Sequence, residues 1–165
     1  MRKIAFGIAA AAAVAATPAL AGTATNTLPV EVNVINSCTI AATPMNFGSP
    51  TAIGTSNVDR TSTVSLQCTN GANYDVAMDP GLNASGTQRR MSNGAATPVF
   101  VPYAIYRDTT YTAAAEWTAA VGGTVSGTAG VSGLVSLTAY GRIPSTATSV
   151  GAGSYLDTVT VTVTF

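Results

Sequence analysis

The segment Val159-Thr160-Val161-Thr162-Val163-Thr164-Phe165 alternates apolar and threonine side chains over its whole length. A period of two with many β-branched residues is typical of a β-strand. The apolar side chains share one face, and no charged residue interrupts the segment. Because an exposed apolar edge strand promotes aggregation, we expect another strand, from this chain or from a second one, to cover it.

Residues 28–34 repeat this pattern near the other end of the chain. One interpretation makes the segment the first strand of the domain, with Pro29 at a sheet edge because proline lacks the N–H of a ladder residue. The other interpretation makes it a strand that completes a second molecule. The apolar positions that share one face are Leu28, Val30, Val32 and Val34.

Short alternating stretches separated by turn sequences fill the chain between these two segments. Turns are indicated by pairs such as Asn70-Gly71 and Asn93-Gly94. Residues 113–117 are compatible with one helical turn, and we expect the stretch Gly122–Gly133, rich in small residues, to be a long loop. The pattern predicts a single antiparallel β-sandwich domain. The alternating stretches are 61–68, 74–79, 99–105 and 135–139.

The first 21 residues have the layout of a secretory signal peptide. A basic start, Met1-Arg2-Lys3, precedes the apolar run Ile4–Ala16, and Ala19-Leu20-Ala21 offers a cleavage site. The apolar run is shorter than the roughly 20 residues that span a bilayer. We therefore expect an exported chain that begins at Gly22.

The composition of the expected mature chain, 22–165, excludes several classes of function. It has five arginines, no lysine, no histidine and seven acidic residues, a formal charge of −2. Without histidine, neither a Ser-His-Asp site nor a Cys-His site is possible, and without lysine there is no Schiff-base chemistry. The usual zinc ligand sets are missing, and so is the basic patch of a nucleic-acid-binding protein. We expect no catalytic residue, no metal, no cofactor and no nucleic acid.

Cys38 and Cys68 are the two cysteines of the sequence. In an exported chain we expect them to form a disulfide rather than to act as reactive thiols, because no histidine is present to activate a thiol. The closed loop of about 30 residues would contribute roughly 3 kcal/mol to stability.

Two further features have structural interpretations. Arg107 and Asp108 are adjacent charges in a charge-poor chain, and we expect an ion pair or a loop anchor there. Trp117 is expected in the core rather than on a sugar-binding face, because a lone tryptophan in a sandwich is usually buried.

Several blocks occur together with the two cysteines and the signal peptide. They are Phe47-Gly48, Val64–Cys68, Tyr103–Asp108, Tyr140–Pro144 and Gly153–Phe165. In this combination the chain resembles the spore coat protein U family, which includes the subunits of archaic, Csu-type chaperone–usher pili.

The resemblance implies an incomplete immunoglobulin-like antiparallel β-sandwich, the pilin fold, which lacks its last strand and is completed in trans by an N-terminal donor strand. It implies three parts: a signal peptide, 1–21; a donor-strand extension, 22–36; and the pilin domain, 37–165. Leu28, Val30, Val32 and Val34 match the donor strand. The acceptor groove and chaperone-binding strand match Val159, Val161, Val163 and Phe165.

The resemblance also implies a function without chemistry. The chain would be a structural subunit of a cell-surface pilus, exported through the periplasm and supporting adhesion and biofilm formation. Its partners would be identical or related pilin subunits in a head-to-tail polymer, a periplasmic pilus chaperone and an outer-membrane usher. The single-domain length favours a shaft subunit. Two alternatives remain open: a spore-coat structural component of the same family, and a monomeric exported β-sandwich binding module.

Overall fold

The computed structural model describes residues 22–51, 53–148 and 150–165, and within these ranges the protein is built from β-strands. One short 3₁₀ turn, η1 (Ala113–Ala115), interrupts them, where the sequence predicts a single helical turn. None of the described segments forms a helix long and apolar enough to cross a membrane. The predicted signal peptide, 1–21, lies outside the described residues. The strands are β1 (Cys38–Ala42), β2 (Val58–Cys68), β3 (Asn73–Met78), β4 (Arg89–Ser92), β5 (Phe100–Tyr106), β6 (Val125–Thr128), β7 (Leu134–Ile143) and β8 (Val161–Thr164).

The chain divides into two units, one ending at Asn33 and one comprising Val34–Phe165, and each is described by itself. Residues 22–33 form neither strand nor helix. The side chains of Leu28, Val30 and Val32 are 86–88% exposed. The first strand of the second unit is β1, which begins at Cys38.

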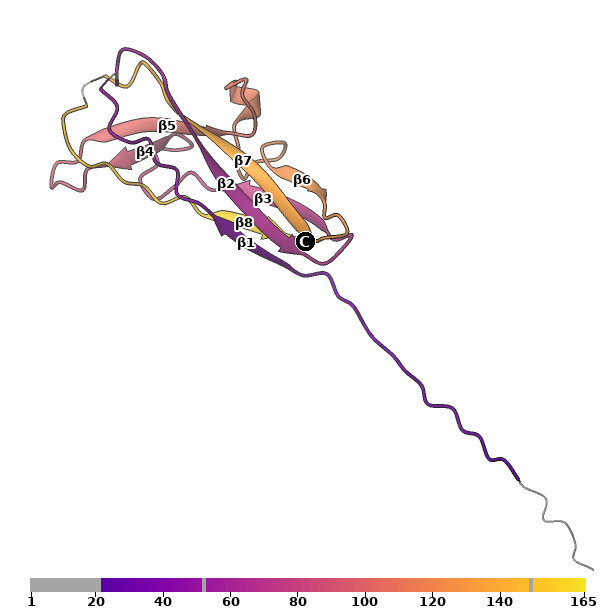
Figure 1. Ribbon diagram of the computed structural model, residues 1–165. Coiled ribbons are helices and arrows are strands. Elements are labelled where there is room, and N and C mark those ends of the chain that lie inside the picture. Colours follow the sequence, from indigo (N-terminus) through magenta and orange to yellow (C-terminus); the bar gives the residue numbers. More distant parts are fainter. Residues whose placement is uncertain (1–21, 52, 149) are drawn as a thin grey trace, which may run out of the picture. The chain divides into compact units, whose positions relative to one another are not determined.

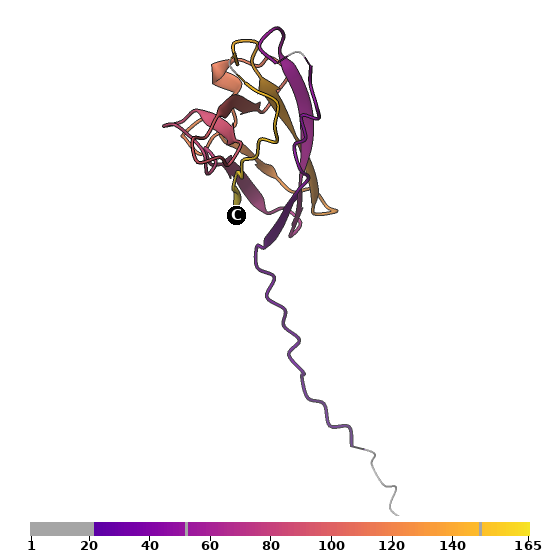
Figure 2. The ribbon, with the colours of Figure 1, turned by 90° about the vertical axis from the view of Figure 1, so that its left-hand side faces the viewer.

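The second unit contains two antiparallel sheets (Figures 1 and 2). Within the described residues, the larger sheet has the order β1-β2-β7-β5-β4, and the smaller has the order β6-β3-β8. The long pair β2–β7 is the centre of the larger sheet, in register from Val58↔Ile143 to Gln67↔Leu134. The predicted antiparallel β-sandwich is confirmed.

The core lies between the two sheets and follows the period of two. Val64 and Leu66 of β2 are 1% exposed, while Ser65 between them faces outward. Val76 of β3 is fully buried. Trp117 is fully buried as well, and its indole N–H donates to the Val76 carbonyl at 2.8 Å. A buried indole needs such an acceptor. The prediction that Trp117 belongs to the core is therefore confirmed.

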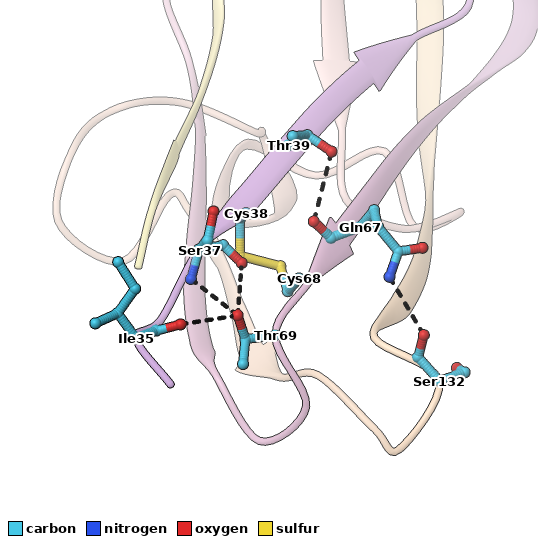
Figure 3. Close-up of a disulfide and its surroundings, with 8 residues drawn as sticks. All are labelled: Ile35, Ser37, Cys38, Thr39, Gln67, Cys68, Thr69 and Ser132. Carbon is cyan, nitrogen blue, oxygen red and sulfur yellow. Dashed lines mark hydrogen bonds between the residues drawn. A yellow bond between two sulfur atoms is a disulfide. The ribbon is translucent and has the colours of Figure 1, made fainter. Parts of the chain in front are cut away.

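The predicted disulfide is present between Cys38 and Cys68, with an S–S distance of 2.03 Å (Figure 3). The two residues are direct partners in the β1–β2 ladder. Beside it, the Thr69 hydroxyl donates to the Ile35 carbonyl at 3.1 Å and accepts from the Ser37 N–H at 3.2 Å. The chain is thus fixed to β2 just before β1 starts.

The stretch Gly122–Gly133 is not the long loop that its small residues suggest, because it contains β6. This strand pairs with β3 from Asn73↔Thr128 to Val76↔Val125. The Tyr74 ring and hydroxyl occupy the place where a Cβ at position 127 would be, so a residue with a side chain does not fit there. The glycine that interrupts the sequence pattern is therefore what lets Tyr74 lie across the strand.

Arg107 acts as a loop anchor, one of the two predicted roles. Its guanidinium donates to the carbonyls of Thr124 and Ala114, which joins the loop after β5 to the segment before β6. Asp108 accepts from Thr110 instead, with hydrogen bonds from its N–H and hydroxyl.

Candidate functional site

The candidate site lies between two strands that are each at the edge of a sheet. Among the described residues, β1 pairs with β2 alone and β8 pairs with β3 alone. The strands β1 and β8 are nevertheless close to each other, as Figure 1 shows, without a ladder between them. Each therefore has backbone N–H and C=O groups on one side that lack a strand partner, which is the arrangement that accepts an added strand.

A groove opens along this edge, and its deep part is a cavity of about 420 Å³. Apolar side chains from both sheets line it, so the cavity reaches the core. They include Val64 of β2, Met78 of β3, Ile105 of β5, Ala139 of β7 and Val161 of β8. A strand placed between β1 and β8 would cover these side chains.

A second cavity of about 730 Å³ continues the first toward residues 44–50, Ile53 and residues 150–156. The two cavities share Met45, Phe47, Met91 and Tyr155, so together they form one continuous depression. We call it the edge groove. Its lining comes from strands and loops that are far apart in the sequence.

The residues predicted for the acceptor strand have different positions. Val159 and Val161 line the deep cavity. Val163 is half-buried and packs against the core, while Phe165 lies beyond the end of β8 and is 53% exposed. Their predicted role as a strand-binding surface stays a prediction.

The four predicted donor residues lie outside the core. Leu28, Val30 and Val32 belong to the first unit, and Val34, the first residue of the second unit, is 72% exposed. Four apolar side chains at a spacing of two are therefore available to a partner, and their function as a donor strand stays a prediction.

A polar network holds the chain that leads into β8. Asp157 accepts hydrogen bonds from the Tyr103 hydroxyl at 2.7 Å and from the Asn83 N–H at 3.0 Å. Asp79 accepts from the N–H groups of Thr160 and Gly81, each at 2.9 Å. Burial and the hydrogen bond to Asp157 raise the pKa of Tyr103 far above its ordinary value. Hydrogen bonds thus anchor one side of the segment 157–160, whereas its other side has no strand partner in the described part of the chain.

Arg89 of β4 is a structural residue that the sequence analysis missed. It is 1% exposed, and its guanidinium donates to the carbonyls of Met78, Asp79 and Trp117. Its other partner is the Glu116 carboxylate at 3.3 Å. Burial lowers the pKa of Arg89, and the Glu116 charge opposes that shift. Nothing in the local pattern marks this arginine as buried, because its partners come from distant segments.

The site is suited to binding a strand rather than to a reaction. Within the described ranges, no group of three or more His, Cys, Asp or Glu side chains could hold a metal ion. Asp157 lines the groove, and its carboxylate is engaged by hydrogen bonds. The Asp79 carboxylate, in the loop after β3, is engaged in the same way. The groove offers apolar pockets and two unpaired strand edges, which together are the elements of β-strand addition.

Fold and groove thus define a class of protein: a β-sandwich with an unfilled strand position at one edge. The chain belongs to the Spore Coat Protein U domain family, whose model matches residues 24–162. It is 34% identical over 176 residues to Protein U of Myxococcus xanthus, covering 95% of this chain and 93% of that relative. The resemblance on which the sequence analysis relied is confirmed.

Among solved structures, the chain is similar to a chain of the CsuC–CsuE chaperone–tip adhesion subunit pre-assembly complex from the archaic chaperone–usher Csu pili of Acinetobacter baumannii. The TM-score is 0.57 and the identity 26%, over 80% of this chain and 40% of that one. This chain therefore spans less than half the length of the matched chain. The family and this neighbour together indicate a structural protein of the pilus or spore-coat type.

Proposed function

We propose that this protein is a subunit of a surface pilus that polymerises by donor-strand complementation. In this mechanism the N-terminal extension, 22–36, of one copy fills the edge groove of the next copy. The observation that carries the proposal is the pair of neighbouring strands, β1 and β8, which lie at unpaired edges with an apolar groove between them.

The proposed donor segment has the alternating apolar pattern of a strand that buries one face. The seven residues Leu28–Val34, fully extended, are about 23 Å long. Their four apolar side chains share one face and are 72–88% exposed in the chain by itself. Burying them would contribute about 6–12 kcal/mol before the loss of chain entropy is subtracted. The segment therefore gains most of its interaction energy from a partner.

The proposed contact is head-to-tail, because one copy uses its extension and the other uses its groove. A heterologous contact of this kind does not close on itself and generates a filament. Within the second unit, Thr69 bonds the Ile35 carbonyl and the Ser37 N–H, so the root of the extension is fixed immediately before β1. Subunits linked in this way would be connected by short, anchored segments.

The proposal includes further partners and a cellular setting. The Csu neighbour was solved as a complex of a chaperone with a tip adhesion subunit. By analogy we propose a periplasmic chaperone that occupies the same groove before assembly, and an outer-membrane usher that exchanges it for a donor strand. The assembled fibre would stand on the cell surface and support adhesion and biofilm formation, with no catalytic role.

A spore-coat setting is the second candidate. It is favoured by the family description, Spore Coat Protein U domain, since the Myxococcus relative is itself called Protein U and is similar over nearly its whole length. The same strand exchange would then build a coat layer instead of a pilus. Immunolabelling of the producing cells distinguishes the two settings, since pilus labelling follows surface filaments and coat labelling follows the spore surface.

The test of polymerisation uses the chain 22–165 and two variants with the same added charge. Val32→Asp places a carboxylate on the apolar face of the donor segment, and Asn33→Asp places one on the opposite face. We expect filaments in negative-stain electron micrographs of the unaltered chain and of Asn33→Asp. We expect monomers of Val32→Asp, because no arginine or lysine of the described ranges lines the groove to pair with a buried carboxylate. If the unaltered chain stays monomeric and stable, the proposal is wrong and a monomeric binding module takes its place.

A further inference from the structure

The methionine sulfurs of this chain gather at the edge groove. The sequence contains four methionines, and Met1 belongs to the predicted signal peptide. The other three, Met45, Met78 and Met91, all line the deep cavity. They come from the segment after β1, from β3 and from β4, so only the folded chain brings them to one place.

The three methionines differ in their access to solvent. Met78 is 3% exposed, whereas Met45 and Met91 are half-buried and line both cavities of the groove. The Met45 sulfur lies over the backbone of Gly141 in β7, where the Cβ of any other residue would be. Met45 thus lies across β7, and together with Met91 it forms an open part of the groove wall.

We propose that Met45 and Met91 are a reversible oxidation site that controls whether the edge groove accepts a strand. This inference rests on the proposed function, because it concerns the same groove. The oxidant is a two-electron oxidant of the peroxide class. A sulfur lone pair attacks one peroxide oxygen, the O–O bond breaks and an S–O bond forms. The thioether becomes a sulfoxide, and the peroxide is reduced to water or to the corresponding alcohol.

The cysteines of the chain leave the oxidation to methionine sulfur. Within the described residues there is no free cysteine, because Cys38 and Cys68 are joined in the disulfide. No thiol of the chain therefore competes for the oxidant. Methionine sulfoxide is reduced back to methionine by dedicated reductases, so the change can be reversed.

Oxidation changes the groove from an apolar surface into a polar one. A sulfoxide is polar and chiral, and it disrupts interfaces built on methionine. A donor strand would bury the new oxygen among apolar side chains, where a polar group without a partner is unfavourable. Conversely, a strand already in the groove would cover Met45 and Met91 and slow their oxidation. The site would therefore act on empty subunits and spare assembled ones.

The experiment uses the chain 22–165 carrying Val32→Asp, so that its own extension does not fill the groove, and a synthetic peptide of residues 22–36 with the unaltered sequence. The chain is treated with hydrogen peroxide, and the sulfoxide at each methionine is followed by mass spectrometry. We expect Met45 and Met91 to oxidise first, with Met78 slower, and the peptide to slow Met45 and Met91 several-fold. Equal rates for all three methionines, unchanged by the peptide, would overturn the assignment.

The second measurement is the affinity for the peptide before and after oxidation. We expect binding to weaken about tenfold or more on oxidation and to recover after treatment with methionine sulfoxide reductases. The double variant Met45→Leu/Met91→Leu serves as the control, because its affinity, whatever its value, should be the same before and after peroxide. If oxidised and reduced chains bind the peptide equally, the oxidation site is refuted while donor-strand binding stands. If even the reduced chain does not bind the peptide, the proposed function fails, and this inference fails with it.

Discussion

The donor-strand proposal makes its most direct prediction for the substitution Val32→Ala in the peptide 22–36. In the chain by itself the Val32 side chain is 87% exposed, so nearly all of its burial would come from the groove. Alanine removes two methyl groups, and each buried carbon of this kind contributes about 0.8 kcal/mol. The expected loss is about 1.6 kcal/mol, or about 15-fold in affinity, and more if the groove does not close over the vacated space.

The assay is isothermal titration of peptides into the chain 22–165 carrying Val32→Asp. The matched control is Asn33→Ala, which also shortens a side chain but lies on the opposite face of an extended strand. We expect Asn33→Ala to bind within about twofold of the unaltered peptide. Equal losses for the two alanine peptides would refute a strand that inserts one face into the groove, since register depends on the alternation.

Three further predictions concern the domain itself. Replacing Cys38 and Cys68 by serine is expected to lower stability by about 3 kcal/mol and the thermal midpoint by about 10 °C, and a midpoint unaffected by reduction of the native chain would contradict this. Gly141→Ala should destabilise by about 1–3 kcal/mol in denaturant titrations, because its Cβ meets both the Met45 sulfur and the buried Phe47 ring. Gly130→Ala, with nothing near its Cβ, should be close to neutral. The thermal midpoint should change little between pH 5 and 9. It should decrease at pH values under about 4, where carboxylates take up protons. The Arg142 hydrogen bond holds the pKa of Asp59 below its ordinary value. The stabilisation that this pair gives to the fold is complete above the pKa that Asp59 has in the unfolded chain. It is lost as the pH falls through the pKa of Asp59 in the folded chain. An Asp59→Asn variant should therefore lose less stability in acid than the unaltered chain, and an equal loss would contradict the assignment.

The strands that the sequence predicted best are those in which every second residue is buried. Val64 and Leu66 in β2 repeat at the period of the strand and are buried. Val161 and Val163 in β8 repeat at the same period and are half-buried against the core. The disulfide was equally accessible to sequence reasoning, because the chain has just two cysteines to join. In each case the signal is local or follows from a simple count.

Other elements were missed or misplaced because distant contacts decide them. β6 is hidden by small residues, and its existence depends on pairing with β3 and on the space that Gly127 leaves for Tyr74. The final strand was expected over Val159–Phe165, but β8 comprises only Val161–Thr164. The preceding backbone bonds instead to the loop after β3, through Thr158 and Thr160.

By itself, the sequence determined that this protein is an antiparallel β-sandwich with one disulfide and with an alternating apolar segment near each end of the exported chain. Period-two alternation is enough for that, because it dictates which face of each strand avoids water. Only the tertiary structure decided that β1 and β8 become neighbouring edges, that Arg89 is buried, and that Met45, Met78 and Met91 meet in one groove. A groove is a space left between segments, and it exists only after long-range contacts have set those segments in place.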